Sequence, residues 1–155
     1  MAMTKLNEKR AAARRIALQA IYQAEIQGED FIVQMLPEFV SQATADNDIR
    51  QLATLMACGA WDYRHEADPW AERLIPHWNL SRLAAVDRNI LRLALWELTH
   101  QPQTPGKVVL DEAINMAREY STAESSTFIN GVLDAAFKQY TGLTTTSEAE
   151  SQPRA

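Results

Sequence analysis

The chain has 155 residues, which is enough for one domain or for two small helical halves that share an interface. Hydrophobic residues make up 46% and charged residues 23%, as in a soluble globular protein, and no apolar stretch approaches the roughly 20 residues of a membrane span. The net charge of −5 argues against a protein that binds nucleic acid with its whole surface.

The first predicted helix covers about residues 5–27. Apolar residues recur there with a period of 3.6 residues, which predicts one buried stripe, and Gly28 follows at the usual position of a C-cap. The segment is also basic: residues 1–22 hold five cations against Glu8, a balance of +4 that leaves −9 on the other 133 residues. This asymmetry indicates a local basic footprint or, equally well, an ordinary solvated helix face.

Two prolines shape the expectations for the middle of the chain. A short helix is expected at about 31–40, bent or broken at Pro37. The acidic loop 46–48 then caps a long helix that reaches about residues 63–66. Pro69 begins another short segment, because a proline ends or kinks the helix that precedes it.

Residues 80–101 are the most helix-prone part of the chain. Apolar rows on two faces, one of them through Leu83, predict that this helix is covered on both sides and lies at the centre of the fold. Asn79 is expected to cap its start. Glu97 shares an apolar row, so it needs a partner there; a structural ion pair or a hydrogen bond at a helix end is favoured over a functional acid.

Two further helices follow. Thr104 as N-cap, with Pro105 at the first helical position, opens one of them. Residues 121–124 have the spacing of a capping box at the start of the other, which runs to about Tyr140. Gly131 lies inside this last helix and is expected at a close-packing position. The tail 141–155 has no apolar face and is expected to be disordered, so the predicted domain spans residues 1–140.

No group of residues has the spacing of a catalytic, metal or cofactor site. His65, His77 and His100 lie in separate segments, and the five glycines are scattered singly rather than gathered in a phosphate-binding loop. The lone cysteine, Cys58, lies in an apolar helical context typical of a buried thiol. Since the N-terminus also lacks the apolar stretch of a signal peptide, we expect a cytoplasmic protein that is not an enzyme.

One row of the first helix combines basic and aromatic residues. The row has a residue at every fourth position and consists of Arg10, Arg14, Leu18 and Tyr22. Arg15 lies on the side of Tyr22, and both neighbouring arginines are expected to be exposed. Guanidinium groups bind phosphates and a tyrosine ring stacks on an unpaired base, so this face suits single-stranded RNA better than duplex DNA. The residues alone leave an alternative open, in which Tyr22 packs against a neighbouring helix and the arginines are simply solvated.

Four sequence blocks resemble the NusB family of bacterial transcription antitermination factors, in the family's order and spacing. The first is Arg14-Arg15 followed by ALQAIYQAE at 17–25, which resembles the arginine-rich opening helix of the family. The others are VDRNILRLALWEL at 86–98, Pro105 with KVVLDEAINMAREY at 107–120, and STFINGVLD at 126–134. The resemblance covers about residues 9–139.

The resemblance implies an all-α fold of about seven helices in two packed helical subdomains and a role without catalysis. Family members bind the boxA element of ribosomal-RNA leaders together with the small-subunit ribosomal protein NusE, and that pair joins NusA, NusG and RNA polymerase. Asp87 matches an acidic position associated with NusE, and Glu124 lies in a loop tied to the RNA complex, although capping explains it as well. The expected RNA-binding residues are Lys5, Lys9, Arg10, Arg14, Arg15, Tyr22, Phe128 and Asn130.

The chain departs from the family in its basic cluster. Ala11, Ala12 and Ala13 follow Arg10, where the family usually has a denser run of arginines. If all five cations reached phosphates, the salt slope for single-stranded RNA would be on the order of −3. We therefore expect weak binding of RNA by the chain alone, strengthened by the ribosomal partner.

Two other functions stay open. The first is an RNA-binding module like the NusB-like domain of ribosomal-RNA cytosine methyltransferases. Such enzymes need an additional α/β domain, for which this chain has neither the length nor the glycine loop. The second is a protein–protein adaptor whose basic helix is hidden in a homodimer, as the resemblance permits for some members.

Overall fold

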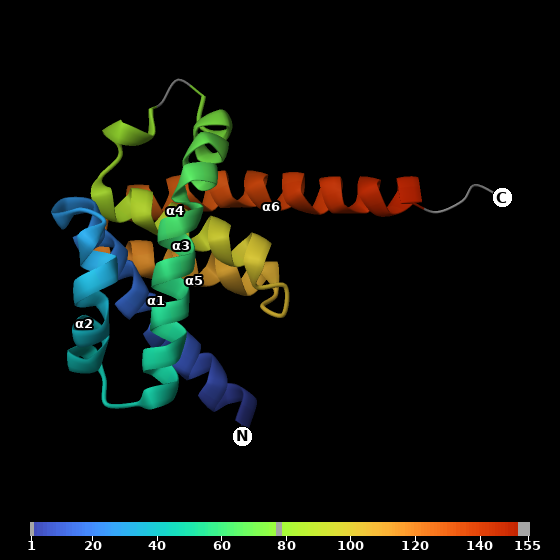
Figure 1. Ribbon diagram of the computed structural model, residues 1–155. Helices are drawn as coiled ribbons and strands as arrows, with labels where there is room; N and C mark the ends of the chain where they lie inside the picture. Colours follow the sequence, from blue (N-terminus) through green and yellow to red (C-terminus); the bar gives the residue numbers. More distant parts are fainter. Residues whose placement is uncertain (1, 77–78, 152–155) are drawn as a thin grey trace.

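The computed structural model describes the backbone of residues 2–76 and 79–151, and the side-chain surroundings of residues 4–76 and 79–142. Every regular element within these ranges is helical (Figure 1). The α-helices are α1 (Ala2–Gln27), α2 (Leu36–Ala43), α3 (Asn47–Leu74), α4 (Ala85–His100), α5 (Gly106–Tyr120) and α6 (Ala123–Ser151). A π-helical segment, Phe31–Met35, precedes α2, and a 3-10 turn, Leu80–Arg82, precedes α4. The all-α prediction is confirmed, and the helix number is close to the expected seven.

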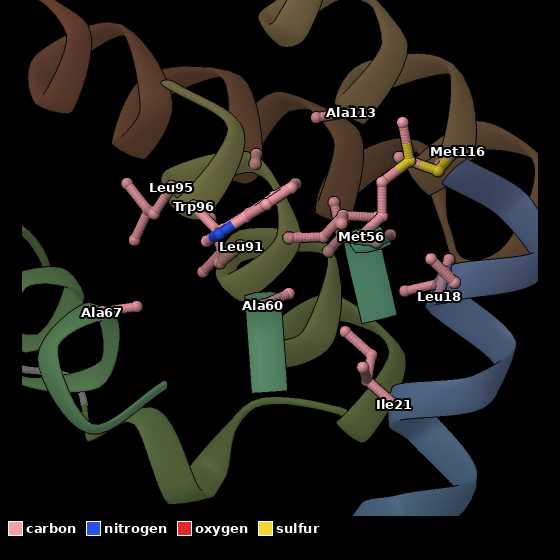
Figure 2. Close-up of a cluster of buried hydrophobic side chains, with 14 of the residues drawn as sticks. Leu18, Ile21, Met56, Ala60, Ala67, Leu91, Leu95, Trp96, Ala113 and Met116 are labelled. Atoms are coloured by element: carbon pink, nitrogen blue, oxygen red, sulfur yellow. The ribbon is translucent and has the colours of Figure 1, made fainter. Parts of the chain in front are cut away.

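Helix α4 lies at the centre of the fold, as its two apolar faces predict. Residues 89–98 are all buried, and α4 packs against α1, α3, α5 and α6. Figure 2 shows Leu91, Leu95 and Trp96 of this helix among side chains of α1, α3 and α5. Because the hydrophobic effect grows with the apolar area removed from water, this helix organises the core.

Two predicted helix boundaries are confirmed. Gly28 has φ +100°, a left-handed conformation that ends α1 and that glycine adopts without strain. Asp46 begins α3: its carboxylate accepts hydrogen bonds from the backbone N–H groups of Asp48 at 2.8 Å and Ile49 at 3.2 Å.

Helix α3 is longer than the sequence predicts. Pro69 lies inside it rather than at the start of a new segment, and the helix continues to Leu74. Trp70 and Ala71, the two residues that follow Pro69, are buried. This tertiary packing outweighs the cost of the backbone hydrogen bond that a proline removes.

The segment before α4 also differs from the prediction. The side chain of Asn79 accepts a hydrogen bond from the N–H of Ser81 at 3.0 Å, so it caps the 3-10 turn rather than α4. Leu83 lies in the bend after that turn, and α4 begins at Ala85. The apolar row predicted through Leu83 therefore belongs to two elements.

The starts of α5 and α6 are each shifted by one residue. Pro105, not Thr104, is the N-cap residue of α5, and no side-chain hydrogen bond caps that end. At α6 the hydroxyl of Thr122 accepts a hydrogen bond from the N–H of Ser125 at 3.0 Å, so Glu124 is not the capping partner. Consecutive Ser, Thr and Pro residues offer competing helix starts, and the turns between the helices decide among them.

The close-packing prediction for Gly131 is wrong. A Cβ atom there would meet no atom within 4 Å, because this side of α6 is open. The close-packed glycines are Gly59, which faces the ring of Trp96, and Gly106, which faces the ring of Phe137.

Helix α6 continues to Ser151 and projects beyond the other helices (Figure 1). It therefore passes residue 140, where the sequence places the end of the folded domain, and the division into a domain and a disordered tail stays a prediction. Among the described residues, no helix combines the length and the apolar character needed to span a lipid bilayer.

Candidate nucleic-acid interface

Arg14 is buried, so the expectation that it is exposed is wrong. Only 3% of its side chain is accessible, and its guanidinium binds the carboxylate of Glu97 on α4 with Nε–Oε2 and Nη2–Oε1 distances of 2.9 and 2.5 Å. Arg14 and Leu18 belong to the same helical row as Arg10, but they lie beside the buried alanine stripe of α1 and are themselves buried. The structural ion pair expected for Glu97 is confirmed.

Arg15 is half-buried and paired with two carboxylates of α5. Its Nε and Nη2 donate to the two carboxylate oxygens of Glu119 at 2.9 and 2.7 Å, and Nη1 donates to Glu112 at 3.0 Å. Nη1 also donates to the carbonyl oxygen of Ala11 at 2.9 Å. The hydrogen bond from Arg15 lowers the pKa of Glu119 below its usual value.

The other cations of α1 differ in their pairing. Lys9 contacts Asp48 at 2.6 Å and Asp46 at 3.4 Å, at the start of α3. Lys5 and Arg10 make no ion pair with any residue that the structure describes. Of the five cations that the sequence offers to RNA, one is therefore buried, two are paired near the surface and two make no ion pair within the described ranges.

Tyr22 borders an open hollow of about 400 Å³ between α1, α4 and the end of α5. We call it the tyrosine hollow; its lining residues are Leu18, Gln19, Tyr22, Ala84, Ala85, Val86 and Tyr120. Tyr22 and Tyr120 expose 36% and 41% of their surface. Each ring thus has an apolar body beside the hollow and a face that is open to a ligand.

Asp87 borders a second hollow, of about 240 Å³, which we call the aspartate hollow. Its lining residues are Leu83, Asp87, Thr122, Glu124, Ser125 and Phe128. Asp87 is 6% exposed, and its Oδ2 accepts a hydrogen bond from the hydroxyl of Ser125 at 2.8 Å. Its Oδ1 is buried without a hydrogen-bond partner among the described residues. Buried polar atoms are normally paired, so this oxygen is an unsatisfied acceptor next to the aspartate hollow.

The two hollows lie on either side of the first turn of α4. The tyrosine hollow touches residues 84–86 and the end of α5, and the aspartate hollow touches Leu83, Asp87 and the start of α6. Phe128 belongs to the aspartate hollow, but Asn130 lines neither one; it is exposed on α6, about 200° further around the helix. The structure thus brings together most, but not all, of the predicted site residues.

Two further arginines near this region are tied into the fold. Arg88 donates from Nε to Glu25 of α1 at 2.6 Å. Arg92 donates from Nε and Nη2 to Asp68 of α3 at 2.8 and 2.7 Å. These pairs join α1, α3 and α4, so neither guanidinium is available to an anion without breaking that link.

Three residues of this region have little or no signal in the sequence: Tyr120, Ser125 and Glu119. An aromatic residue at the last position of a helix is the only local signal for Tyr120. Nothing in the local pattern points from Ser125 to Asp87, 38 positions earlier, or from Glu119 to Arg15, 104 positions earlier. Only the packing of α4 with α6 and of α1 with α5 creates these contacts.

The candidate catalytic residues stay apart. Across the described ranges, no three or more His, Cys, Asp or Glu side chains are placed to hold a metal ion. Burial raises the pKa of the Cys58 thiol above its ordinary value, which disfavours the reactive thiolate. His65 is exposed, His100 packs edge-on against the ring of Tyr63, and His77 lies outside the described residues.

The comparison with protein families assigns the chain. The model of the NusB family matches residues 11–138, which is most of the 155-residue sequence. The chain belongs to the NusB family. The transcription antitermination protein NusB of Symbiobacterium thermophilum is 33% identical over 150 residues, 92% of this chain and 98% of the relative. The NusB protein of Acidothermus cellulolyticus is 37% identical over 144 residues, 93% and 97% of the two chains. These NusB relatives confirm the predicted family and the prediction of a protein that is not an enzyme.

Solved NusB structures share the fold. T. maritima NusB superposes with a TM-score of 0.73 at 32% identity, over 83% of this chain and 90% of that chain. A complex of the antitermination factors NusB and NusE with double-stranded RNA contains a chain with a TM-score of 0.77 at 26% identity, over 86% of this chain and 98% of that chain. The predicted NusB-like fold is confirmed.

Proposed function

We propose that this member of the NusB family is a transcription antitermination factor that binds RNA and a ribosomal protein on adjacent surfaces. The observation that carries the proposal is the pair of hollows beside the first turn of α4, one framed by exposed tyrosines and the other by a buried carboxylate oxygen without a partner. The fold shared with a NusB that forms a complex with NusE and RNA supports it.

The RNA surface begins on α1 and ends at the tyrosine hollow. Lys5 and Arg10 are unpaired within the described ranges and offer charge to phosphates. Lys9 and Arg15 join them when phosphate replaces their carboxylate partners. The exposed ring of Tyr22 stacks on an unpaired base, which favours a single-stranded boxA element over a duplex. Arg14 supports this surface from inside by holding α1 against α4.

Phe128 and Asn130 extend the RNA surface on α6. Phe128 is half-buried at the aspartate hollow, and Asn130 is exposed with an amide that both donates and accepts hydrogen bonds. The two side chains point to different sides of the helix, so RNA reaches Asn130 only if it passes along α6.

The partner surface is the aspartate hollow. Apolar side chains of a NusE-type ribosomal protein pack against Leu83, and a backbone N–H or a hydroxyl of that protein donates to the carboxylate of Asp87, which turns toward the hollow because its free oxygen is buried in the unbound chain. A central polar anchor surrounded by apolar contacts is typical of the residues that dominate protein–protein binding.

The larger assembly and the compartment follow from this function. We propose that the RNA-bound pair joins NusA, NusG and RNA polymerase in the cytoplasm. The relatives named above are antitermination proteins, which favours such a factor over a module of ribosomal-RNA methyltransferases. A homodimer that covers α1 would instead compete with RNA.

A binding titration tests the proposal. Labelled boxA leader RNA is titrated with the full chain at physiological salt, with and without the purified ribosomal protein, and a scrambled RNA of equal length is the control. We expect weak binding by the chain alone and much tighter, boxA-selective binding with the partner. Nanomolar affinity of the chain alone for boxA RNA contradicts the expected weak binding. Equal binding of both RNAs in the presence of the partner contradicts the proposed function. Light scattering during the titration reports whether RNA dissociates a homodimer.

A further inference from the structure

The guanidinium of Arg15 is almost fully used by the chain itself. An arginine has five N–H donors. Four of those of Arg15 are directed at Glu119, Glu112 and the carbonyl oxygen of Ala11. The pair with Glu119 has two parallel hydrogen bonds, the same geometry in which a guanidinium binds a phosphate. A phosphate therefore cannot take the bidentate position while Glu119 holds it.

We propose that Glu119 is an internal competitor of RNA phosphate, which occupies Arg15 in the free protein and must leave it when RNA binds. This inference rests on the proposed function and adds a residue that sets RNA affinity. Glu119 reduces the sequence-independent attraction of α1 for any polyanion, so that selection depends more on the base that the tyrosine hollow accepts. Tyr120, the next residue along α5, lines that hollow.

Glu119, rather than Glu112, is the carboxylate that leaves. The side chain of Glu119 is 46% exposed, so it can move into water, whereas that of Glu112 is only 19% exposed. Glu112 also lies 3.6 Å from the buried guanidinium of Arg14, which holds it in place. Release of Glu119 leaves Arg15 oriented by Glu112 and by the carbonyl oxygen of Ala11, with Nε and Nη2 open to phosphate.

The size of the effect follows from the exposure of the pair. Exposed ion pairs contribute little in water, so Glu119 moderates RNA binding rather than blocking it. Glu119→Gln keeps the shape of the side chain but removes its charge. We expect this variant to bind RNA about two- to fivefold more tightly at low salt. Arg15 contacts the phosphate in both complexes, so the number of phosphate contacts, and with it the salt slope, is expected to change little.

The experiment compares five full-length proteins by fluorescence anisotropy with one single-stranded RNA at several salt concentrations. They are the wild type, Glu119→Gln, Asp111→Asn, Arg15→Gln, and the double variant Arg15→Gln with Glu119→Gln. Asp111 is exposed on the same helix, so Asp111→Asn controls for the loss of one negative charge. We expect a gain in affinity for Glu119→Gln that exceeds the gain for Asp111→Asn and that disappears in the Arg15→Gln background.

Three results overturn the inference. Equal gains for Glu119→Gln and Asp111→Asn would show a general charge effect, and a gain that persists without Arg15 would show that the carboxylate acts elsewhere. RNA binding by the wild type with no gain in Glu119→Gln would overturn the inference and leave the proposed function standing. Failure of every protein to bind RNA, even with the ribosomal partner present, would overturn the proposed function itself.

Discussion

Arg14 and Glu97 form a charged pair inside the helical core. Three hydrogen bonds join the guanidinium to the carboxylate, and neither side chain is more than 3% exposed. Both charges lose their hydration on folding, and each replaces it with the other. Their contribution to stability therefore depends on both partners being present.

Arg14→Ala is expected to destabilise the fold by about 3–5 kcal/mol, because Glu97 is left buried without its cation. Urea denaturation followed by circular dichroism measures the change. Arg15→Ala is the control: its pairs are partly exposed, so the expected loss is at most about 1 kcal/mol. A small loss of stability with a large loss of RNA affinity in Arg14→Ala would contradict the buried role of this residue.

At the scale of the elements, two glycines inside helices have opposite surroundings. Gly59 lets α3 approach the ring of Trp96 on α4, and that ring is 4% exposed and enclosed by the core (Figure 2). Gly131 lies on an open side of α6. Both are helical positions where alanine has the better intrinsic propensity, so only the neighbouring helix distinguishes them.

Gly59→Ala is expected to destabilise the fold by about 1–3 kcal/mol, because the added methyl group overlaps Trp96 and forces α3 and α4 apart. Gly131→Ala is expected to stabilise it by about 0.5–1 kcal/mol, since nothing opposes the gain in helix propensity. Thermal unfolding of the two variants beside the wild type measures both shifts. A rise in Tm for both variants would show that Trp96 moves aside without cost.

At the scale of the whole molecule, α4 connects the two candidate binding surfaces. Its first turn separates the tyrosine hollow from the aspartate hollow, and its buried middle is covered by four other helices. RNA and a ribosomal protein bound on either side would touch the same turn. Thermodynamic linkage requires that any change RNA makes in the affinity for the ribosomal protein be matched by an equal change that this protein makes in the affinity for RNA.

Asp87→Asn is expected to weaken binding of the NusE-type protein by about 1.5–3 kcal/mol, because a charged acceptor is lost from the centre of the interface. The amide has the size of the carboxylate and still accepts the hydrogen bond from Ser125, so the fold is retained. Isothermal titration calorimetry with the ribosomal protein measures the change, and Asp62→Asn on the exposed side of α3 is the matched control. Equal partner affinity in the two variants would remove Asp87 from the interface.

Local patterns predicted most of the fold and part of the site. The apolar periods of α1 and α4, the end at Gly28 and the cap at Asp46 depend on residues within a few positions of one another, so the sequence contains them directly. The prolonged α3 and the shifted helix starts depend on packing, which local propensity does not include. The row from Arg10 to Tyr22 on α1 also shows this limit. The helical period places these residues on one side of α1, but it does not show which helices pack against that side.

The sequence by itself determined that this protein is helical, where most of its helices lie, and to which family it belongs. Only the tertiary structure decided which cations of α1 remain available. Arg14 meets Glu97 across 83 positions and Arg15 meets Glu119 across 104. Helical periodicity assigns a residue to a face of its own helix, whereas the charge that it meets there belongs to another helix. The arrangement of helices around α4 sets that neighbour.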